Sequence, residues 1–424
     1  MQKENLIEAF AKLWTELFSS PVHLDSLLSK QPKSVKSVLA RTVIPILLGP
    51  VSEAESFGVG VNPGEPWSLP RERVAQWRTA RLLAERIYAS LSNPPQPPAP
   101  MREDFPEPMI QEWESEWGEE TARSLTSILA REAPLGIRAA RGKSAVNLAR
   151  ELKSSSRIPV KIEVSDISPV GVRLGGYTQL FGLEAYDKGE FEIQDEGSQL
   201  MALFTLWPDV FGSILAEKPG AVSEDRRAPP VPTQLRFGGS ASSGLSIIDA
   251  CAGAGGKSLA MADALKGKGR FFSYDISATK LQALRRRATR AGVNNIQAVA
   301  LEEGSEAAQL EKFRCSADIV LVDAPCSGWG VLRRNPDIKW RQDPSRLSRM
   351  PDIQLRLLEQ YSALVKPGGR LVYGVCTFRR AETRELVEAF LRERNHEFEL
   401  GAGGYLGPGP CDGFFMQEFR KRQK

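Results

Sequence analysis

The sequence predicts an α/β protein with a helical part first, a small α/β domain in the middle, and a Rossmann-like parallel sheet at the C-terminus. Three observations support this fold class. Helical patterns fill residues 1–92, and a Pro-rich segment at 93–100 follows them. From residue 245 onward, short apolar runs alternate with helical patterns, which is typical of a parallel sheet covered on both faces.

The helical part is expected to be an all-α domain over residues 1–92. Apolar residues near the N-terminus recur every three or four positions, which predicts an amphipathic helix. They are Leu6, Phe10, Leu13, Trp14 and Leu17. The segment NPPQPPAP holds five prolines in eight residues and predicts an extended connector. We therefore expect residues 93–133 to form a Pro-rich, acidic linker with a helix.

Two α/β domains are expected after this linker, over residues 134–192 and 193–424. In the first, 135–140, 158–164 and 169–174 alternate like strands, and 144–155 has the pattern of an amphipathic helix. The second opens with IQDEGSQ and a helix. Its predicted strands are LSIIDA (245–250), RFFSYD (270–275), IQAVA (296–300), ADIVLVD (317–323) and RLVYGV (370–375). Parallel sheets of this kind bind ligands at the carboxyl ends of their strands.

The residue composition limits the kinds of site and partner that we expect for this chain. The two histidines, His23 and His396, lie far apart, and the five cysteines show no C-x-x-C spacing, so we expect no metal site. No stretch approaches the roughly 18 apolar residues of a membrane span, and the N-terminus lacks the apolar block of a signal peptide. We therefore expect a cytoplasmic protein without membrane contact, and a monomer by default. Basic runs at 280–290, 333–341 and 419–424 indicate either solvated faces or a polyanionic partner.

A glycine-rich loop follows the first predicted strand of the last domain. It runs Asp249-Ala250-Cys251-Ala252-Gly253-Ala254-Gly255-Gly256-Lys257-Ser258. A phosphate-binding P-loop would need glycine at 251, and a dinucleotide fingerprint would need glycine at 258, so both patterns fail. S-adenosylmethionine, a nucleoside cofactor without phosphates, needs the glycines and an acid after the second strand, where Asp275 lies. The structural alternative is a tight turn with Asp275 capping a helix.

Two cysteines leave neighbouring strand ends. Cys326 follows the fourth strand in Asp323-Ala324-Pro325-Cys326, and Cys376 follows the fifth. A free cysteine is most often a small packed hydrophobe, but two thiols on the ligand face favour catalysis. A thiolate that adds to C6 of a pyrimidine makes C5 nucleophilic towards a sulfonium methyl group. Asp323 is placed to assist as an acid near the base.

These motifs resemble the Sun (Fmu-like) family of S-adenosylmethionine-dependent RNA cytosine-C5 methyltransferases over roughly residues 134–419. The resemblance rests on IQDEGSQ, DACAGAGGKS, Asp275, DAPCSGWGVLRRNPDIKWR, LVKPGGRLVYGVCTF and DGFF. It implies a class I methyltransferase sheet with Cys376 as the nucleophile and Cys326 assisting product release. It also implies that Cys251, Ala252, Gly253, Ala254, Gly255, Gly256 and Lys257 line the cofactor, together with Asp275 and Asp323.

The resemblance further implies a NusB-like RNA-binding domain at the N-terminus and an RNA-contacting, RRM-like small α/β domain in the middle. It also implies ribosomal RNA, most specifically small-subunit (16S) RNA, as the substrate. The chain departs from the family pattern in three places. Ala254 stands where a proline is usual, and Val375 and Thr377 flank the nucleophile in place of Thr and Ser. Glu303, or else Glu302, replaces an Asp near the adenine. The alternatives are an RNA-binding assembly factor that kept the fold without catalysis, and the same reaction on transfer RNA.

Overall fold

The computed structural model describes residues 3–19, 27, 105–155, 158, 160–175, 178, 180–220, 229–232, 244–302, 304–340 and 343–423. The chain divides into two compact units. One comprises Met1–Glu132 and Val331–Arg349, and the other comprises Ala133–Gly330 and Met350–Lys424. None of the described helices combines the length and the apolar character that a membrane crossing needs.

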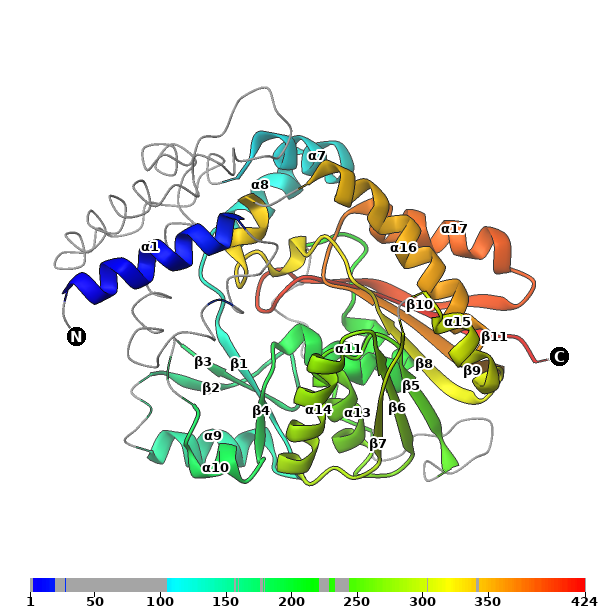
Figure 1. Cartoon of the computed structure of the whole chain (residues 1–424), viewed down its shortest axis with the longest axis horizontal. Coiled ribbons are helices and arrows are strands. Elements are labelled where there is room, and N and C mark those ends of the chain that lie inside the picture. The colour runs from blue at the N-terminus through cyan, green and yellow to red at the C-terminus, as the bar shows by residue number, and fades with distance from the viewer. Residues whose placement is uncertain are drawn as a thin grey trace. The chain divides into compact units, whose positions relative to one another are not determined.

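The first unit is helical where it is described (Figure 1). Helix α1 (Lys3–Ser19) buries Phe10, Leu13 and Trp14, as the spacing of its apolar residues predicts. Helices α7 (Glu107–Trp117) and α8 (Glu119–Leu129) follow and bury Trp113 and Leu125. The expected helices between residues 28 and 92, the Pro-rich segment and the comparison with NusB lie outside the described residues.

The small α/β part of the second unit has a four-stranded antiparallel sheet within the described residues. Its strands are β1 (Leu135–Ala139), β2 (Ile162–Val164), β3 (Gly171–Leu174) and β4 (Phe191–Ile193), in the order β2-β3-β1-β4. Helix α9 (Ala145–Ser154) packs on this sheet through Leu148 and Leu152, and α10 (Glu184–Asp187) is a single turn. Ser144 accepts the backbone N–H of Asn147 and so caps α9. The predicted strands and helix of this part are confirmed.

The larger sheet has seven strands among the described residues. They are β5 (Ser246–Asp249), β6 (Arg270–Asp275), β7 (Ile296–Ala300), β8 (Ala317–Asp323), β9 (Val365–Val375), β10 (Phe398–Leu406) and β11 (Phe414–Lys421). Their order is β10-β11-β9-β8-β5-β6-β7. Strands β5 to β9 pair in parallel, which confirms the predicted α/β class, whereas β11 is antiparallel to both of its neighbours.

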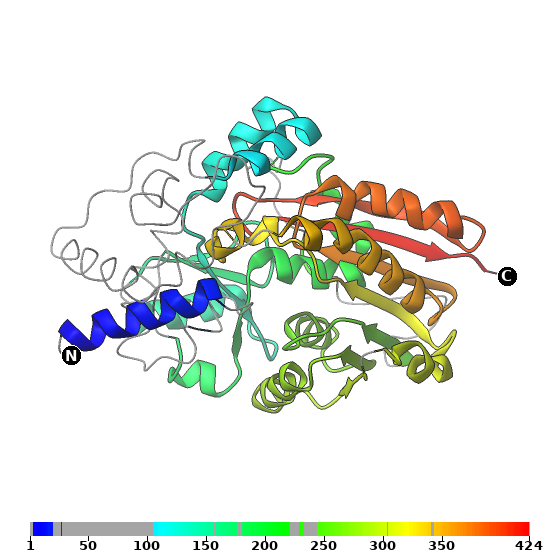
Figure 2. The same ribbon diagram turned by 45° about the horizontal axis from the view of Figure 1, so that its top comes forward.

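Helices cover both faces of the larger sheet. They are α11 (Glu196–Leu206), α13 (Gly256–Ala264), α14 (Ala278–Ala291), α16 (Pro344–Ser362) and α17 (Arg384–Arg394). Figure 2 shows α13 and α14 together on one side of the sheet and α17 on the other. Burial on both faces explains why Ile247, Ile248 and Leu321 form continuous apolar strands. Because β5, β6, β8 and β9 are parallel, their carboxyl ends meet at one edge, and the predicted site residues follow those ends.

The C-terminal hairpin of β10 and β11 is an addition to the predicted sheet. The segment FELGAGGYL is rich in glycine and FFMQEFRK alternates poorly, so neither carries a clear strand pattern. Pairing with β9 supplies the stabilisation that local propensity lacks.

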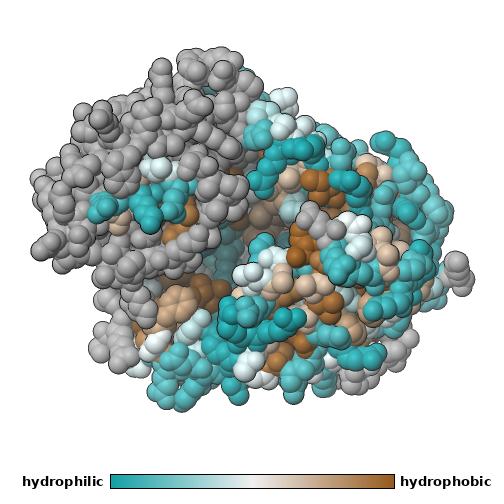
Figure 3. Space-filling model, in the orientation of Figure 1, coloured by the Kyte–Doolittle hydropathy of each residue, from teal (hydrophilic) through white to brown (hydrophobic). Residues whose placement is uncertain are grey.

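On the described surface that faces the viewer in Figure 3, hydrophilic residues predominate and hydrophobic ones form small separate patches.

Candidate active site

The glycine-rich loop joins the end of β5 to the start of α13. Gly255 has a φ of +81°, and a Cβ added there would lie 2.4 Å from Cγ of Leu284 on α14. Only glycine therefore fits this position, both for its backbone conformation and for its close approach to a neighbour. Gly253 also has a positive φ, +54°, but an added Cβ would meet nothing within 4 Å. The loop is thus packed against the protein on one side and open beside Gly253.

Asp275 lies at the end of β6, as predicted, and contacts the loop directly. Its Oδ2 accepts the backbone N–H of Gly253 at 2.8 Å, and its Oδ1 accepts that of Ser277 at 2.7 Å. Asp275 therefore holds the turn, as the structural alternative required, but it does not cap α14, because the N-cap is Ser277, whose hydroxyl accepts the backbone N–H of Lys280. Each carboxylate oxygen can accept a second hydrogen bond, so this role leaves room for ribose hydroxyls as well.

Asp249 is a site residue to which the sequence analysis gave no role. It is 1% exposed, and its Oδ2 accepts the hydroxyl of Ser258 at 2.6 Å. Its Oδ1 has no hydrogen-bond partner within the described part of the chain. Burial raises the pKa of Asp249 to about 7. Its position immediately before the loop, at the carboxyl end of a strand, was the signal that could have identified it.

The charges around the loop suit a cationic cofactor better than a phosphate. Burial raises the pKa of Cys251, and Asp323, Asp249 and Asp275 raise it further, so three carboxylates surround this loop. The cation of the loop, Lys257, is already paired with Asp323. This environment repels phosphate and attracts a sulfonium or ammonium group. Together with the unpartnered oxygen of Asp249 and the open space at Gly253, these residues fit a nucleoside cofactor without phosphates.

The other predicted cofactor residues lie along the same edge. Cys251, Ala252, Gly256 and Lys257 are partly buried, and Ala254 is exposed. The acid pair after β7 is described only in part. Glu302 is exposed there, and Glu303, the preferred candidate, lies outside the described residues.

The two strand-end cysteines are in contact. Cys326 follows β8 and Cys376 follows β9, and their Sγ atoms are 3.2 Å apart. Both side chains are partly buried. The hydrogen bond with Cys376 and burial raise the pKa of Cys326 well above its usual range. Cys326 therefore keeps its proton, and either sulfur can be the donor of this hydrogen bond.

A buried ion pair lies beside the thiols. Nζ of Lys257 is 2.6 Å from Oδ2 of Asp323, and the two side chains are 12% and 25% exposed. Burial alone lowers the pKa of Lys257, but Asp323, and to a smaller extent Cys376, raise it above its ordinary value. Lys257 is thus a permanent cation close enough to Cys376 to stabilise a thiolate there. The ring of Phe414 lies 5.6 Å from the same ammonium group.

Of the three other cysteines, Cys251 belongs to the glycine-rich loop, and neither Cys315 nor Cys411 has a recorded contact with the two thiols among the described residues. Cys315 is exposed and points to the carbonyl of Ala363, and Cys411 is buried. His396 is 68% exposed beside Glu397. His23 lies outside the described residues. The structure therefore brings together two of the five cysteines, which are the two that follow neighbouring strands.

Much of the predicted basic surface is used inside the fold. Arg287 and Arg290, from the run at 280–290, both pair with the buried Glu192 of β4. Arg287 also donates to the carbonyl oxygen of Ala254 in the cofactor loop at 2.7 Å. In the other unit, the guanidinium of Arg333 donates to the backbone carbonyls of residues 131 and 132. These arginines stabilise the protein, and charge runs alone do not identify them as a nucleic-acid surface.

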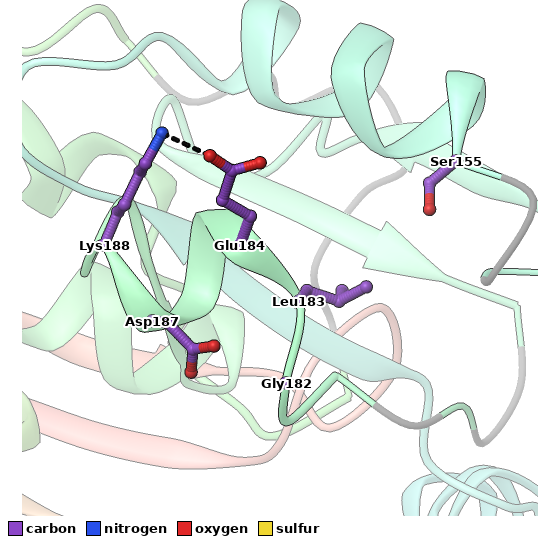
Figure 4. Close-up of a pocket in the computed structure, with 6 residues that line it drawn as sticks. All are labelled: Ser155, Gly182, Leu183, Glu184, Asp187 and Lys188. Carbon is purple, nitrogen blue, oxygen red and sulfur yellow. Dashed lines mark ion pairs between the residues drawn. The ribbon is translucent and has the colours of Figure 1, made fainter.

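A hollow of about 630 Å³ lies on the small α/β part (Figure 4). It is lined by Ser155, Gly182, Leu183, Glu184, Asp187 and Lys188. Figure 4 shows Glu184 and Lys188 turned toward each other, and their ion pair is 2.6 Å long. None of the predicted site residues lines this hollow, so it is separate from the thiol centre.

Residues 241–402 match the family model described as 16S rRNA methyltransferase RsmB/F. A "Probable ribosomal RNA small subunit methyltransferase B" from Bacillus subtilis is 31% identical over 290 residues, which are 68% of this chain and 56% of that protein. This chain thus spans little more than half the length of that relative. The crystal structure of PH0851 has a TM-score of 0.70 at 20% identity and covers 99% of both chains. That of NSun6 from Pyrococcus horikoshii with SFG has a TM-score of 0.59 at 18% identity and covers 76% of this chain and 99% of that one.

The two solved structures share the fold, and the sequence matches coincide with the part that contains both cysteines and the glycine-rich loop. The predicted resemblance is thereby confirmed. We conclude that this chain carries a methyltransferase domain of the RsmB/F family.

Proposed function

We propose that this protein transfers a methyl group from S-adenosylmethionine to the C5 carbon of a cytosine in RNA, through a transient bond between Cys376 and C6 of the base. The contact between the sulfurs of Cys326 and Cys376, 3.2 Å apart beside the glycine-rich loop, is the observation that supports this most directly. The family match supports the coarser statement, methylation of ribosomal RNA.

The cofactor is held by the loop from Cys251 to Lys257 and by Asp275 at the end of β6. When bound, S-adenosylmethionine supplies a methyl group on a cationic sulfur. The carboxylates of Asp275 and Asp323 favour that positive charge, and Asp249 adds to this effect in its ionised form. Glu303, with Glu302 as the alternative, is our candidate for the contact with the adenine.

Cys376 supplies the nucleophile. Its thiolate adds to C6 of the cytosine, and the electron pair of the C5–C6 double bond moves onto C5, which can then take up the methyl group. The C5 proton is afterwards lost to water, and the electron pair that held it re-forms the double bond as the sulfur leaves. Lys257 supports the thiolate on Cys376, since the two groups attract each other.

Cys326 and Asp323 assist these steps. The S–H group of Cys326 hydrogen-bonds to the sulfur of Cys376 and so stabilises the thiolate that leaves at product release. The carboxylate of Asp323 and the ammonium group of Lys257 offer an acceptor and a donor side by side for the polar edge of the base. The target base has to leave its stack to reach them.

The substrate we propose is small-subunit (16S) ribosomal RNA, in agreement with the name of the Bacillus subtilis relative. The small α/β domain at 134–192 and the helical domain at 1–92 are proposed as RNA contacts, and the remaining chain, 193–424, as the catalytic domain. Residues 93–133, predicted as a linker with a helix, contain α7 and α8 and lead from the helical domain to the small α/β domain.

The test is incubation of the full chain with methyl-labelled S-adenosylmethionine and ribosomal RNA from cells that lack this protein. We expect label in 5-methylcytosine after digestion to nucleosides, and none with the Cys376→Ala variant. Absence of label together with normal binding of S-adenosylmethionine would contradict the proposed substrate. Absence of both would favour an RNA-binding assembly factor without catalysis.

A further inference from the structure

We propose that Glu382 is a positioning residue that keeps the loop of Cys326 in place, so that the sulfur of Cys326 stays next to that of Cys376. This inference rests on the proposed function, because it assigns the two thiols their separate roles. Glu382 lies in the 3₁₀ turn Arg380–Glu382, a few residues after Cys376, and its side chain is 0% exposed.

The carboxylate of Glu382 receives donors from three segments of the chain. Its Oε2 accepts the backbone N–H of Ser327 at 2.9 Å and Nε2 of Gln354 at 2.8 Å. Its Oε1 faces a guanidinium nitrogen of Arg379 at 3.2 Å. A buried carboxylate is costly unless such donors satisfy it, and here they come from the loop after β8, from α16 and from the segment after β9.

These contacts bracket Cys326 on both sides. Nε2 of Gln354 donates to the carbonyl of Pro325, the residue before Cys326, at 2.8 Å. Glu382 holds the N–H of Ser327, the residue after it. The backbone is therefore held on both sides of Cys326, by Gln354 before it and by Glu382 after it, and these two side chains are hydrogen-bonded to each other.

The loop that carries Cys376 is tied to the same network. The hydroxyls of Ser327 and Thr377 are 2.7 Å apart, and the N–H of Gly330 donates to the carbonyl of Cys376 at 3.0 Å. The hydroxyl of Tyr373 donates to the backbone carbonyl of Glu382 at 2.8 Å. Glu382 thus lies at the point where the loops of the two cysteines join, and its charge adds to the causes that keep Cys326 protonated.

A glutamine at position 382 would replace one acceptor oxygen with an NH₂ donor. It would then face another donor, Ser327, Gln354 or Arg379, and at least one of these bonds would be lost. The Cys326 loop would loosen, while the residues that contact the cofactor would stay unchanged. Displacement of a reacting group by about 1 Å costs on the order of 100-fold in rate.

Glu418 offers a matched control. It is also 0% exposed and belongs to β11. Among the described residues, its carboxylate pairs with Arg370 and Arg420 and accepts the N–H of Ala402, and none of these belongs to a cysteine loop. The Glu418→Gln variant therefore reports what the loss of a buried carboxylate costs in stability alone.

The experiment compares the parent protein with Glu382→Gln and Glu418→Gln as full chains. Iodoacetamide alkylation across pH, read by mass spectrometry, gives the rates at Cys326 and Cys376 separately. We expect Glu382→Gln to raise the ratio of Cys326 to Cys376 alkylation by about tenfold, since a loosened, less protonated thiol reacts faster, and Glu418→Gln to leave it unchanged. Equal effects of the two variants would overturn the proposal.

Release of RNA gives the second readout. Glu382→Gln should slow breakdown of the covalent protein–RNA complex by roughly 10- to 100-fold, and Glu382→Asp should restore part of the rate. If Glu382→Gln does not fold, Gln354→Ala can be used instead, because it removes the hydrogen bond to the carbonyl of Pro325 on the other side of Cys326. It should shift the alkylation ratio in the same direction, and an unchanged ratio refutes the inference. If the parent forms no complex with RNA while the ratio still shifts, the proposed function fails and the positioning role stands.

Discussion

Alanine at Gly255 should mainly lower the stability of the protein, whereas alanine at Gly253 should mainly weaken cofactor binding. Both have positive φ angles, +54° at Gly253 and +81° at Gly255, so alanine costs about 1–2 kcal/mol of strain at either position. Only at Gly255 would the new Cβ also collide with Leu284, at 2.4 Å. Overpacking of a core contact adds about 1–3 kcal/mol. Gly255→Ala should therefore lower the free energy of unfolding by about 2–5 kcal/mol, and Gly253→Ala by about 1–2 kcal/mol.

The affinity for S-adenosylmethionine should fall more in Gly253→Ala than in Gly255→Ala. The space beside Gly253 is open in the protein, so a methyl group there occupies volume that the cofactor needs. Urea unfolding measures the first effect, and calorimetric titration with S-adenosylmethionine measures the second on folded protein. We expect Gly253→Ala to lose affinity at least tenfold while it remains the more stable variant. Equal losses of stability, or unchanged affinity in Gly253→Ala, would refute the assignment of this loop.

Three further predictions follow from contacts in the second unit. The 3.2 Å separation of the sulfurs predicts that diamide links Cys326 to Cys376, and peptide mapping that finds both thiols free after oxidation would contradict the geometry. Burial raises the pKa of Asp249 from 3.8 to about 7, so between these pH values the folded protein holds a proton that the unfolded chain has released. Stability should therefore fall as pH rises through this window, by up to roughly 1.4 kcal/mol per pH unit, and Asp249→Asn should remove that slope from urea unfolding curves. Arg287→Ala should weaken S-adenosylmethionine binding more than Arg290→Ala does, because only Arg287 also holds a carbonyl of the cofactor loop; equal affinities in the two variants would exclude that role.

Sequence reasoning predicted the residues whose position follows from strand order. Parallel strands bring their carboxyl ends to one edge, so Asp275, Cys326 and Cys376 could be assigned to that edge from the chain alone. The glycines of the loop carried a second local signal, since tight turns after strands need them.

Residues whose role depends on distant partners could not be predicted in this way. Glu382 reads as an ordinary acid before a helix, and its partner Ser327 lies 55 positions away in the sequence. Arg287 and Arg290 read as a solvated or RNA-binding run, because nothing local reveals Glu192, 95 positions from Arg287. Most partners of the buried Glu382 and Glu192 come from distant parts of the sequence, and hydrophobic periodicity carries no information on such pairs.

The site of covalent attachment tests the central claim most directly. The Cys326→Ala variant is incubated with S-adenosylmethionine and substrate RNA, the complex that survives denaturation is digested, and the peptide that bears the nucleotide is sequenced by mass spectrometry. Our account predicts a cytosine adduct on Cys376. Attachment to any other residue, or a methylated product formed by the Cys376→Ala variant, would contradict it.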